Sequence, residues 1–310
     1  MPLVAATGDI LLKSVLIATD FSEASAKALR HALAIARHYG AKVYLVHVVS
    51  SLGFTLAGPD VVNTVTEIVW RDARRLEEDL IQKGALAGLS HEVIVGQGNV
   101  WEELEKIVSQ ERVDLVVLGT HARRGLGKLL LGSVAEHIFR HSDCLVLTVG
   151  PGSLPDSPVN GARAVRPFLF ATDFGGPSLR ALPYAISSAN HFGAKLVLLH
   201  VVPAVPIPEA VHRPSADDVM QARENARVAS LRRLKELTLQ SPKLAAAPEF
   251  MVEFGSPSTE IMQAAQKVKA DAIILGLHRS SHVDTKSHMP WATAYEVVCG
   301  AGCAVLTVRN

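Results

Sequence analysis

The segment from Gly119 to Ser133, GTHARRGLGKLLLGS, carries the residues best suited to hold a phosphate group. It follows the apolar run VDLVVLG and leads into SVAEHIFRH, so it connects a strand pattern to a helix pattern. Unpaired backbone N–H groups at a helix N-terminus, the helix dipole and the Ser133 hydroxyl all favour an anion there. The segment therefore predicts a phosphate-binding loop, in which Gly119 and Gly132 leave room for a ligand beside the backbone.

Three cations lie inside this loop, Arg123, Arg124 and Lys128. Each is a candidate for phosphate contact, and the alternative is that all three are simply solvated, as most Arg and Lys side chains are. The loop is not a Walker loop, because no GKS or GKT follows the glycines, and it does not match GxGxxG.

The glycine spacing resembles the nucleotide loop of the universal stress protein family. In that pattern Gly, two residues, Gly, nine residues and Gly are followed by Ser or Thr. Gly119, Gly132 and Ser133 match in register, whereas Ala122 stands where the second glycine is usual. If that position needs a positive φ, alanine costs on the order of 1 kcal/mol, and its methyl group crowds a phosphate.

The resemblance continues at the start of the chain. KSVLIATDF, residues 13–21, is similar to the family's first strand with its Thr-Asp signature; a helix from Ser22 to Gly40 and a second strand, AKVYLVHVV, follow. The resemblance implies that Asp20 contacts the ribose or base region and that the backbone of Val48 meets adenine. Taken alone, Asp20 also suits a helix-capping or turn position.

The implied ligand is ATP, with Mg²⁺ or Mn²⁺ held through its phosphates, since such ions need only one or two protein ligands. His121 occupies a position that contacts the nucleotide in the family, and a general-base role there would need a suitable pKa and geometry. The residues expected around the nucleotide are Ala18, Thr19, Asp20, Val48, Leu118, Gly119, His121, Ala122, Arg123, Gly132, Ser133 and Val134.

The whole pattern occurs twice. RPFLFATDFGGPSLRALPYAISSANHFGAKLVLLHVV, beginning at Arg166, repeats the ATDF strand end, the glycine-terminated helix and the second strand, and CAVLTV from Cys303 repeats CLVLTV from Cys144. Such a repeat predicts two domains, 1–150 and 165–310, joined by a linker at 151–164 that is rich in Pro, Gly and Ser.

Alternating strand and helix patterns predict an α/β fold, with a parallel sheet covered by helices on both faces in each unit. In the first unit we expect strands at 13–19, 42–48, 91–96, 114–119 and 144–149. The resemblance implies five strands in the flavodoxin-like or Rossmann-like order 3-2-1-4-5, with the switch point where Asp20 and the glycine loop emerge. It also implies that units pair through their last strands, either within one chain or in a homodimer.

The second unit keeps the fold pattern but not the phosphate loop. Its fourth strand also ends in a glycine, Gly276. However, Trp291 and Ala292 stand at the places of the first unit's Gly132 and Ser133, so the open backbone and the hydroxyl are both lost. We therefore expect one nucleotide site per chain, in the first unit.

Composition narrows the class of protein. The chain has 310 residues, 48% of them hydrophobic, yet no apolar run approaches the roughly 18 to 20 residues that cross a bilayer. The apolar residues before Lys13 lack a basic leading segment and are assigned to the first strand. A formal net charge of +1 argues against broad nucleic-acid binding, and three cysteines suit reduced thiols in a cytoplasmic protein.

Two functions from different classes fit these residues. One is a regulatory stress-response protein that holds ATP in its first unit and signals to a downstream protein. The other is an interaction protein of the same fold that has lost its ligand, which Ala122 and the degenerate second loop favour. A slow ATP hydrolase is a third alternative; no Ser-His-Asp or Cys-His arrangement with a supporting motif indicates stronger catalysis.

Overall fold

The computed structural model describes residues 3–4, 10–50, 59–120, 131–150, 153, 166–204, 215–241, 243–277 and 292–309. The first half contains β3 (Ser14–Ala18), α1 (Glu23–Tyr39), β4 (Lys42–Ser50), α2 (Pro59–Gln82), β5 (His91–Gly98), α3 (Val100–Gln110), β6 (Leu115–Gly119), α4 (Ser133–His141) and β7 (Leu145–Val149). The second half contains β8 (Phe168–Ala171), α5 (Gly176–Phe192), β9 (Leu196–Pro203), α6 (Ala216–Leu239), β10 (Glu249–Gly255), α7 (Pro257–Val268), β11 (Ala272–Leu277), α8 (Ala292–Gly300) and β12 (Ala304–Arg309).

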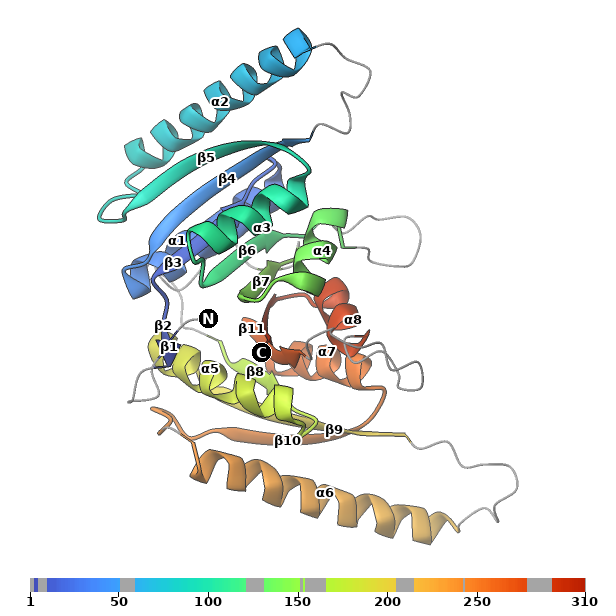
Figure 1. The fold of residues 1–310 in the computed structure, drawn as a ribbon. Coiled ribbons are helices and arrows are strands. Elements are labelled where there is room, and N and C mark those ends of the chain that lie inside the picture. Colours follow the sequence, from blue (N-terminus) through green and yellow to red (C-terminus); the bar gives the residue numbers. More distant parts are fainter. Residues whose placement is uncertain are drawn as a thin grey trace.

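One 10-stranded sheet runs through both halves in the order β10-β9-β8-β11-β12-β7-β6-β3-β4-β5. Within each half all neighbouring strands are parallel. Each half thus has its first strand between its second and fourth, which is the predicted order 3-2-1-4-5. The predicted α/β fold is confirmed. The long helices α2 and α6 lie at opposite ends of the molecule, beside the edge strands β5 and β10 (Figure 1).

The halves join through their last strands, which run antiparallel, with Leu306 opposite Leu147. On either side of this pair, the Thr148 hydroxyl donates to the Val305 carbonyl at 3.3 Å, and the Thr307 hydroxyl donates to the Val146 carbonyl at 3.2 Å. Both threonines are almost fully buried. The predicted pairing of units therefore occurs within one chain, and it leaves β5 and β10 as the edges of the sheet.

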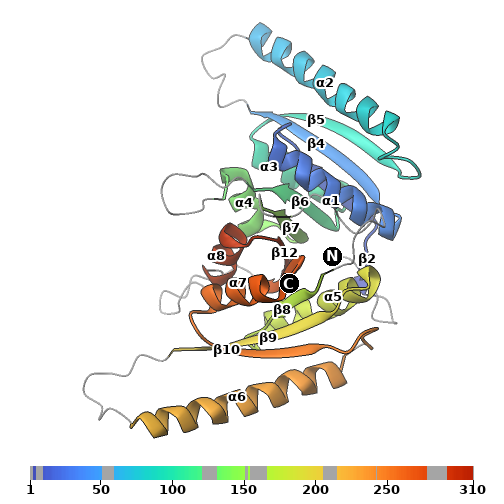
Figure 2. The ribbon, with the colours of Figure 1, turned by 180° about the vertical axis from the view of Figure 1, so that it is seen from behind.

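Helices cover both faces of the sheet (Figure 2). An apolar core that includes residues of α1, α2, α5 and α6 lies on one face, and a second core that includes residues of α3, α4, α7 and α8 lies on the other. Each core is continuous across the junction of the halves. At that junction the Arg309 guanidinium donates to the carbonyls of Phe139 and Arg140, so a cation lies at the C-terminal end of α4.

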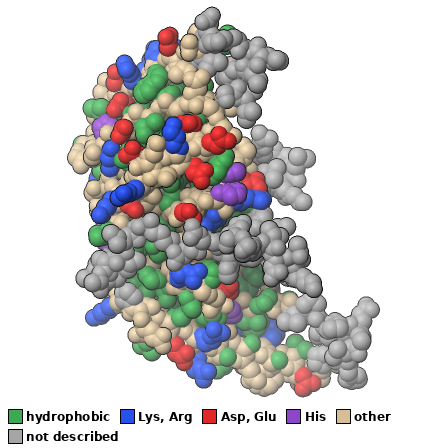
Figure 3. Space-filling model, viewed as in Figure 1, with side chains coloured by type: hydrophobic (Ala, Val, Ile, Leu, Met, Phe, Trp, Pro, Cys, Tyr) green, Lys and Arg blue, Asp and Glu red, His purple; other side chains and the backbone are tan. Residues whose placement is uncertain are grey.

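Helix α1 begins and ends as its sequence predicts. The Ser22 hydroxyl accepts a hydrogen bond from the Ser25 backbone N–H at 3.2 Å, and Gly40 ends the helix with φ of 64°. On the surface, Lys and Arg side chains alternate with Asp and Glu (Figure 3). Many of them form ion pairs along helices, for example Lys83 with Asp79 at 2.7 Å. In the described ranges, no helix is both long enough and apolar enough to span a membrane.

The assignment of the first apolar residues to strand β3 is wrong. A separate antiparallel pair, β1 (Leu3–Val4) with β2 (Ile10–Leu11), forms instead. Ile10 is buried, and its backbone N–H donates to the Ser187 hydroxyl of α5 at 3.0 Å. Ile10 is therefore buried against the second half, a partner far away in sequence that a local pattern does not reveal.

Candidate functional site

A tight turn follows β3 and places Asp20 at the carboxyl edge of the sheet. The Thr19 backbone N–H donates to the Val46 carbonyl at 2.8 Å, and the Thr19 hydroxyl accepts from the Phe21 N–H at 3.0 Å. Asp20 Oδ1 accepts from the Ser22 N–H at 3.0 Å, and the Asp20 side chain is exposed. Asp20 is thus a turn residue in this structure, and it also reaches the solvent at the switch point.

Phe21 and His47 support this turn. Phe21 has φ of 60°, which is uncommon for a bulky residue. Its ring stacks on the His47 imidazole with centroids 4.8 Å apart, and His47 Nδ1 lies 2.7 Å from the Thr19 carbonyl oxygen. Because a carbonyl only accepts, Nδ1 carries the proton. Neither residue was among the predicted site residues, although the sequence repeats both in the second half.

The second half builds the same turn. Phe174 has φ of 62°, and His200 Nδ1 lies 2.8 Å from the Thr172 carbonyl oxygen. Asp173 Oδ1 accepts from the Gly175 N–H at 2.8 Å and from the Ser178 hydroxyl at 2.6 Å. The turn therefore belongs to the fold of each unit, and by itself it does not distinguish a nucleotide site.

Gly119 is required by helix packing. A Cβ at this position would lie 2.5 Å from the carbonyl carbon and oxygen of Ala24 and 2.8 Å from the Ser25 nitrogen. At the matching Gly276 a Cβ would lie 2.2 Å from the Pro177 carbonyl oxygen. The first turns of α1 and α5 thus occupy the space beside these glycines, where the glycine spacing predicts a ligand. This packing explains why the second half keeps the glycine without the loop.

Gly132 has different surroundings. A Cβ there would meet no atom of the described residues within 4 Å, and its φ of −60° suits any residue. Gly132 and Ser133 are both exposed at the start of α4. Of Gly119 and Gly132, only the second thus has no described atom close to the side of its backbone, at a helix end where N–H groups and the dipole favour an anion.

Apolar side chains lie behind this edge. Val48 and Leu118 are buried in the core shared with α3 and α4, and Val134 packs against the same core. Strand β3 pairs with β4 on one side and β6 on the other, so the carboxyl ends of all three strands meet at one edge. The fold thereby brings together Ala18, Thr19, Asp20, Val48, Leu118 and Gly119; His121, Ala122 and Arg123 lie outside the described residues.

The two halves differ at the start of the last helix. Helix α8 begins at Ala292, as α4 begins at Ser133, so the first residue of the helix carries no hydroxyl in the second half; Thr293 follows it. Trp291 lies outside the described residues. Within the ranges that the structure describes, no three His, Cys, Asp or Glu side chains gather as a metal site.

Two parallel α/β units of this order, joined through their last strands, define a tandem protein of the flavodoxin-like or Rossmann-like type. The sequence profile of the universal stress protein family matches residues 12–150 and 164–309. The chain therefore belongs to the universal stress protein family, as a tandem member.

Known relatives agree with this assignment. Universal stress proteins MJ0531 and MJ0577 of Methanocaldococcus jannaschii are each 29% identical, over 46% and 45% of this chain and 84% and 96% of their own length. A crystal structure of a universal stress protein from Archaeoglobus fulgidus covers 96% of this chain and 98% of its own, with a TM-score of 0.66 and 22% identity. This last likeness supports the fold of the whole tandem chain.

Proposed function

We propose that this chain is a cytoplasmic regulatory protein that binds one ATP in its first unit, residues 1–150. The observation that carries the proposal is the start of α4 at Gly132 and Ser133, where no atom of the described residues lies within 4 Å of a Cβ built on Gly132. Helix α4 follows β6, which ends at Gly119 and pairs with β3, the strand that precedes Asp20. This edge combines a helix N-terminus for phosphates with buried apolar residues behind it. Membership of the universal stress protein family supports the choice of nucleotide.

In this proposal the phosphates lie against Gly132, Ser133 and the loop that contains His121, Ala122 and Arg123. Asp20 contacts the ribose or base region, and the backbone of Val48 contacts adenine. Mg²⁺ or Mn²⁺ is held mainly by the phosphates, since such ions need only one or two protein ligands.

The second unit, residues 165–310 after a linker at 151–164, serves as a structural partner. Its β12 covers the β7 edge of the first unit, so the first unit does not need a second chain for that purpose. Its last helix has Ala292 in the place of Ser133, so the hydroxyl at that position is lost. A downstream protein then contacts the surface around α4 and recognises whether the nucleotide is bound.

A second candidate is an interaction protein that needs no nucleotide. Ala122, in the place of the usual glycine, favours it, because a methyl group there crowds the phosphate. The two candidates differ in one measurable property. An ATP-binding protein retains or takes up ATP at cellular concentrations, whereas a ligand-free interaction protein does not.

The test is native mass spectrometry of the purified full chain, followed by calorimetric titration with ATP and Mg²⁺. We expect Gly132→Trp to abolish binding without loss of fold, because the indole fills the open space. Leu239→Trp, at an 84% exposed position on α6, is the matched control and should bind like the wild type. Absence of ATP binding to the wild type at millimolar nucleotide would overturn the proposal.

A further inference from the structure

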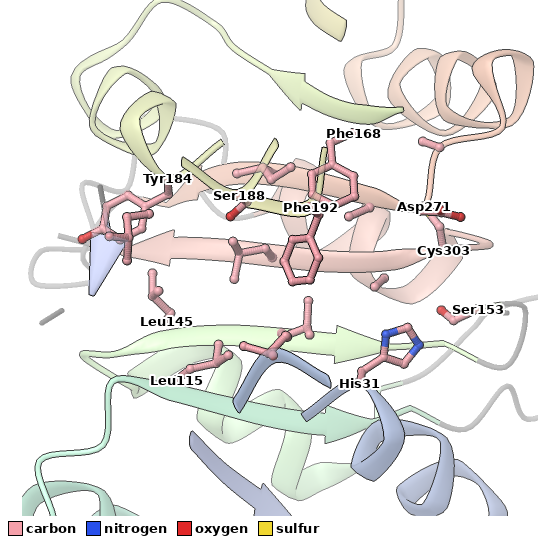
Figure 4. Close-up of a pocket in the computed structure, with 18 of the residues that line it drawn as sticks. His31, Leu115, Leu145, Ser153, Phe168, Tyr184, Ser188, Phe192, Asp271 and Cys303 are labelled. Atoms are coloured by element: carbon pink, nitrogen blue, oxygen red, sulfur yellow. The ribbon is translucent and has the colours of Figure 1, made fainter. Parts of the chain in front are cut away.

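A pocket of about 160 Å³ lies between the two halves of the chain. Helix α1 contributes His31 and Ile35 to its walls, and α5 contributes Tyr184 and Ser188; strands β6, β7, β11 and β12 form its base (Figure 4). The pocket is on the face of the sheet that α1 and α5 cover. The open helix start of the proposed nucleotide site belongs to α4, which packs on the opposite face.

Most of the lining is apolar and belongs to the core. Leu115, Leu145, Phe168 and Ile274 each expose less than a tenth of their surface. Walls of this kind offer water few hydrogen-bond partners, and an engineered cavity of about 150 Å³ lined by such residues stays dry and takes up benzene. The size and the lining of the pocket therefore suit an apolar group about as large as one six-membered ring.

The Ser153 hydroxyl in the lining has no hydrogen-bond partner among the described residues. Ser153 follows β7 and is only 5% exposed. Figure 4 shows it at one end of the pocket, near His31 and Cys303. A buried hydroxyl without a partner is costly, so a ligand that supplies one hydrogen bond gains from pairing with it.

At the same end of the pocket the Asp271 carboxylate lines the wall, and its Oδ2 accepts from the Arg166 backbone N–H at 2.9 Å. A charged ligand would lose its hydration against the mostly apolar walls. Burial raises the pKa of the Cys303 thiol to about 12, and the thiol stays neutral. These surroundings favour a neutral ligand over an ion.

We propose that this pocket binds a small neutral molecule with an apolar body of about one ring and a single hydroxyl or carbonyl group that pairs with the Ser153 hydroxyl. Its walls come from both halves, so the ligand fills the gap between them. Binding there is separate from nucleotide binding, because the two sites lie on opposite faces of the sheet.

Phenol and toluene are matched probes, since they share a shape and differ in one hydroxyl. The experiment is titration of the full chain, with and without saturating ATP, monitored by NMR of isoleucine and leucine methyl groups. We expect both probes to shift the methyl signals of Ile274 and Leu145, with or without ATP, and phenol to bind more tightly. No shift of these signals up to the solubility of either probe would overturn the proposal.

Two kinds of variant test the location and the hydroxyl. Ser188→Phe fills the pocket and should lower the affinity for both probes at least tenfold. If the larger ring disturbs folding, the smaller Ser188→Leu should lower both affinities in the same way. Leu179→Phe adds the same ring at an exposed position of α5 outside the lining and should change neither affinity. Unchanged binding in folded Ser188 variants would contradict the assigned location.

Ser153→Ala removes the unpaired hydroxyl and little volume. We expect it to lower the affinity for phenol roughly three- to tenfold, the range of one ordinary hydrogen bond. The affinity for toluene should stay within about twofold of the wild-type value. The change in the ratio of the two affinities is the decisive quantity, because a general disturbance of the pocket would lower both. An equal loss for phenol and toluene would contradict the pairing with Ser153.

Discussion

Replacing Gly119 by alanine tests whether helix packing requires this glycine. The added Cβ would lie 2.5 Å from the Ala24 carbonyl and 2.8 Å from the Ser25 nitrogen, closer than real Cβ contacts. Both are backbone atoms of α1, so the helix itself must move. Overpacking of this kind typically costs about 1–3 kcal/mol of unfolding free energy.

The assay is urea and thermal unfolding followed by circular dichroism. In domains of 150–250 residues each kcal/mol shifts Tm by about 2–4 °C, so Gly119→Ala should lower Tm by roughly 2–12 °C. Gly276→Ala should behave in the same way, because its Cβ would lie 2.2 Å from the Pro177 carbonyl oxygen.

Gly132→Ala is the matched control, since its Cβ meets no atom of the described residues within 4 Å. Its unfolding free energy should stay within about 0.5 kcal/mol of the wild type, while its affinity for ATP falls. Wild-type stability of Gly119→Ala would show that α1 does not require this glycine. An equal loss of stability in Gly132→Ala, whose Cβ meets no described atom, would show that the close contacts at Gly119 do not cause the loss.

Three further predictions concern other parts of the chain. Ala122→Gly should tighten ATP by about 0.5–1 kcal/mol, a few-fold in Kd by calorimetry; equal or weaker binding would show that the loop has adapted to alanine. Thr148→Val and Thr307→Val each remove a side-chain hydrogen bond between β7 and β12, and each should lower the free energy of unfolding in urea by about 0.5–1.5 kcal/mol. An unchanged free energy of unfolding would show that these hydrogen bonds do not stabilise the junction. The raised pKa of Cys303, about 12 against the usual 9.0, favours the folded state below pH 9, and this stability is lost as the pH rises towards 12. Alkylation of Cys303 at pH 8 should accordingly be far slower in the native chain than in urea, and equal rates would contradict its burial.

The repeated α/β fold is predictable from the sequence because its signals are local. Apolar runs such as the one ending at Gly119 define strands, and glycines such as Gly40 end helices, twice in the same order. The pair β1–β2 was missed for the opposite reason. Ile10 is buried by α5 in the other half, and no local pattern indicates so distant a partner.

The candidate site is only partly predictable, because identical residue types serve different purposes. Gly119 and Gly132 belong to one spacing motif, yet α1 fills the space beside the first, and no described atom lies within 4 Å of a Cβ at the second. The sequence held one clue to this difference, since Gly276 persists in the second half without the rest of the loop. The stacking of Phe21 on His47 depends on two strands meeting, which spacing alone does not reveal.

The most direct test of the proposed function is the number of ATP molecules bound per full-length chain, measured by calorimetry with Mg²⁺ and confirmed by native mass spectrometry. We predict one ATP per chain, lost in Gly132→Trp and retained in Leu239→Trp. Two ATP molecules per chain, or one that persists in Gly132→Trp, would contradict the account, because the nucleotide would then lie elsewhere than at the open start of α4.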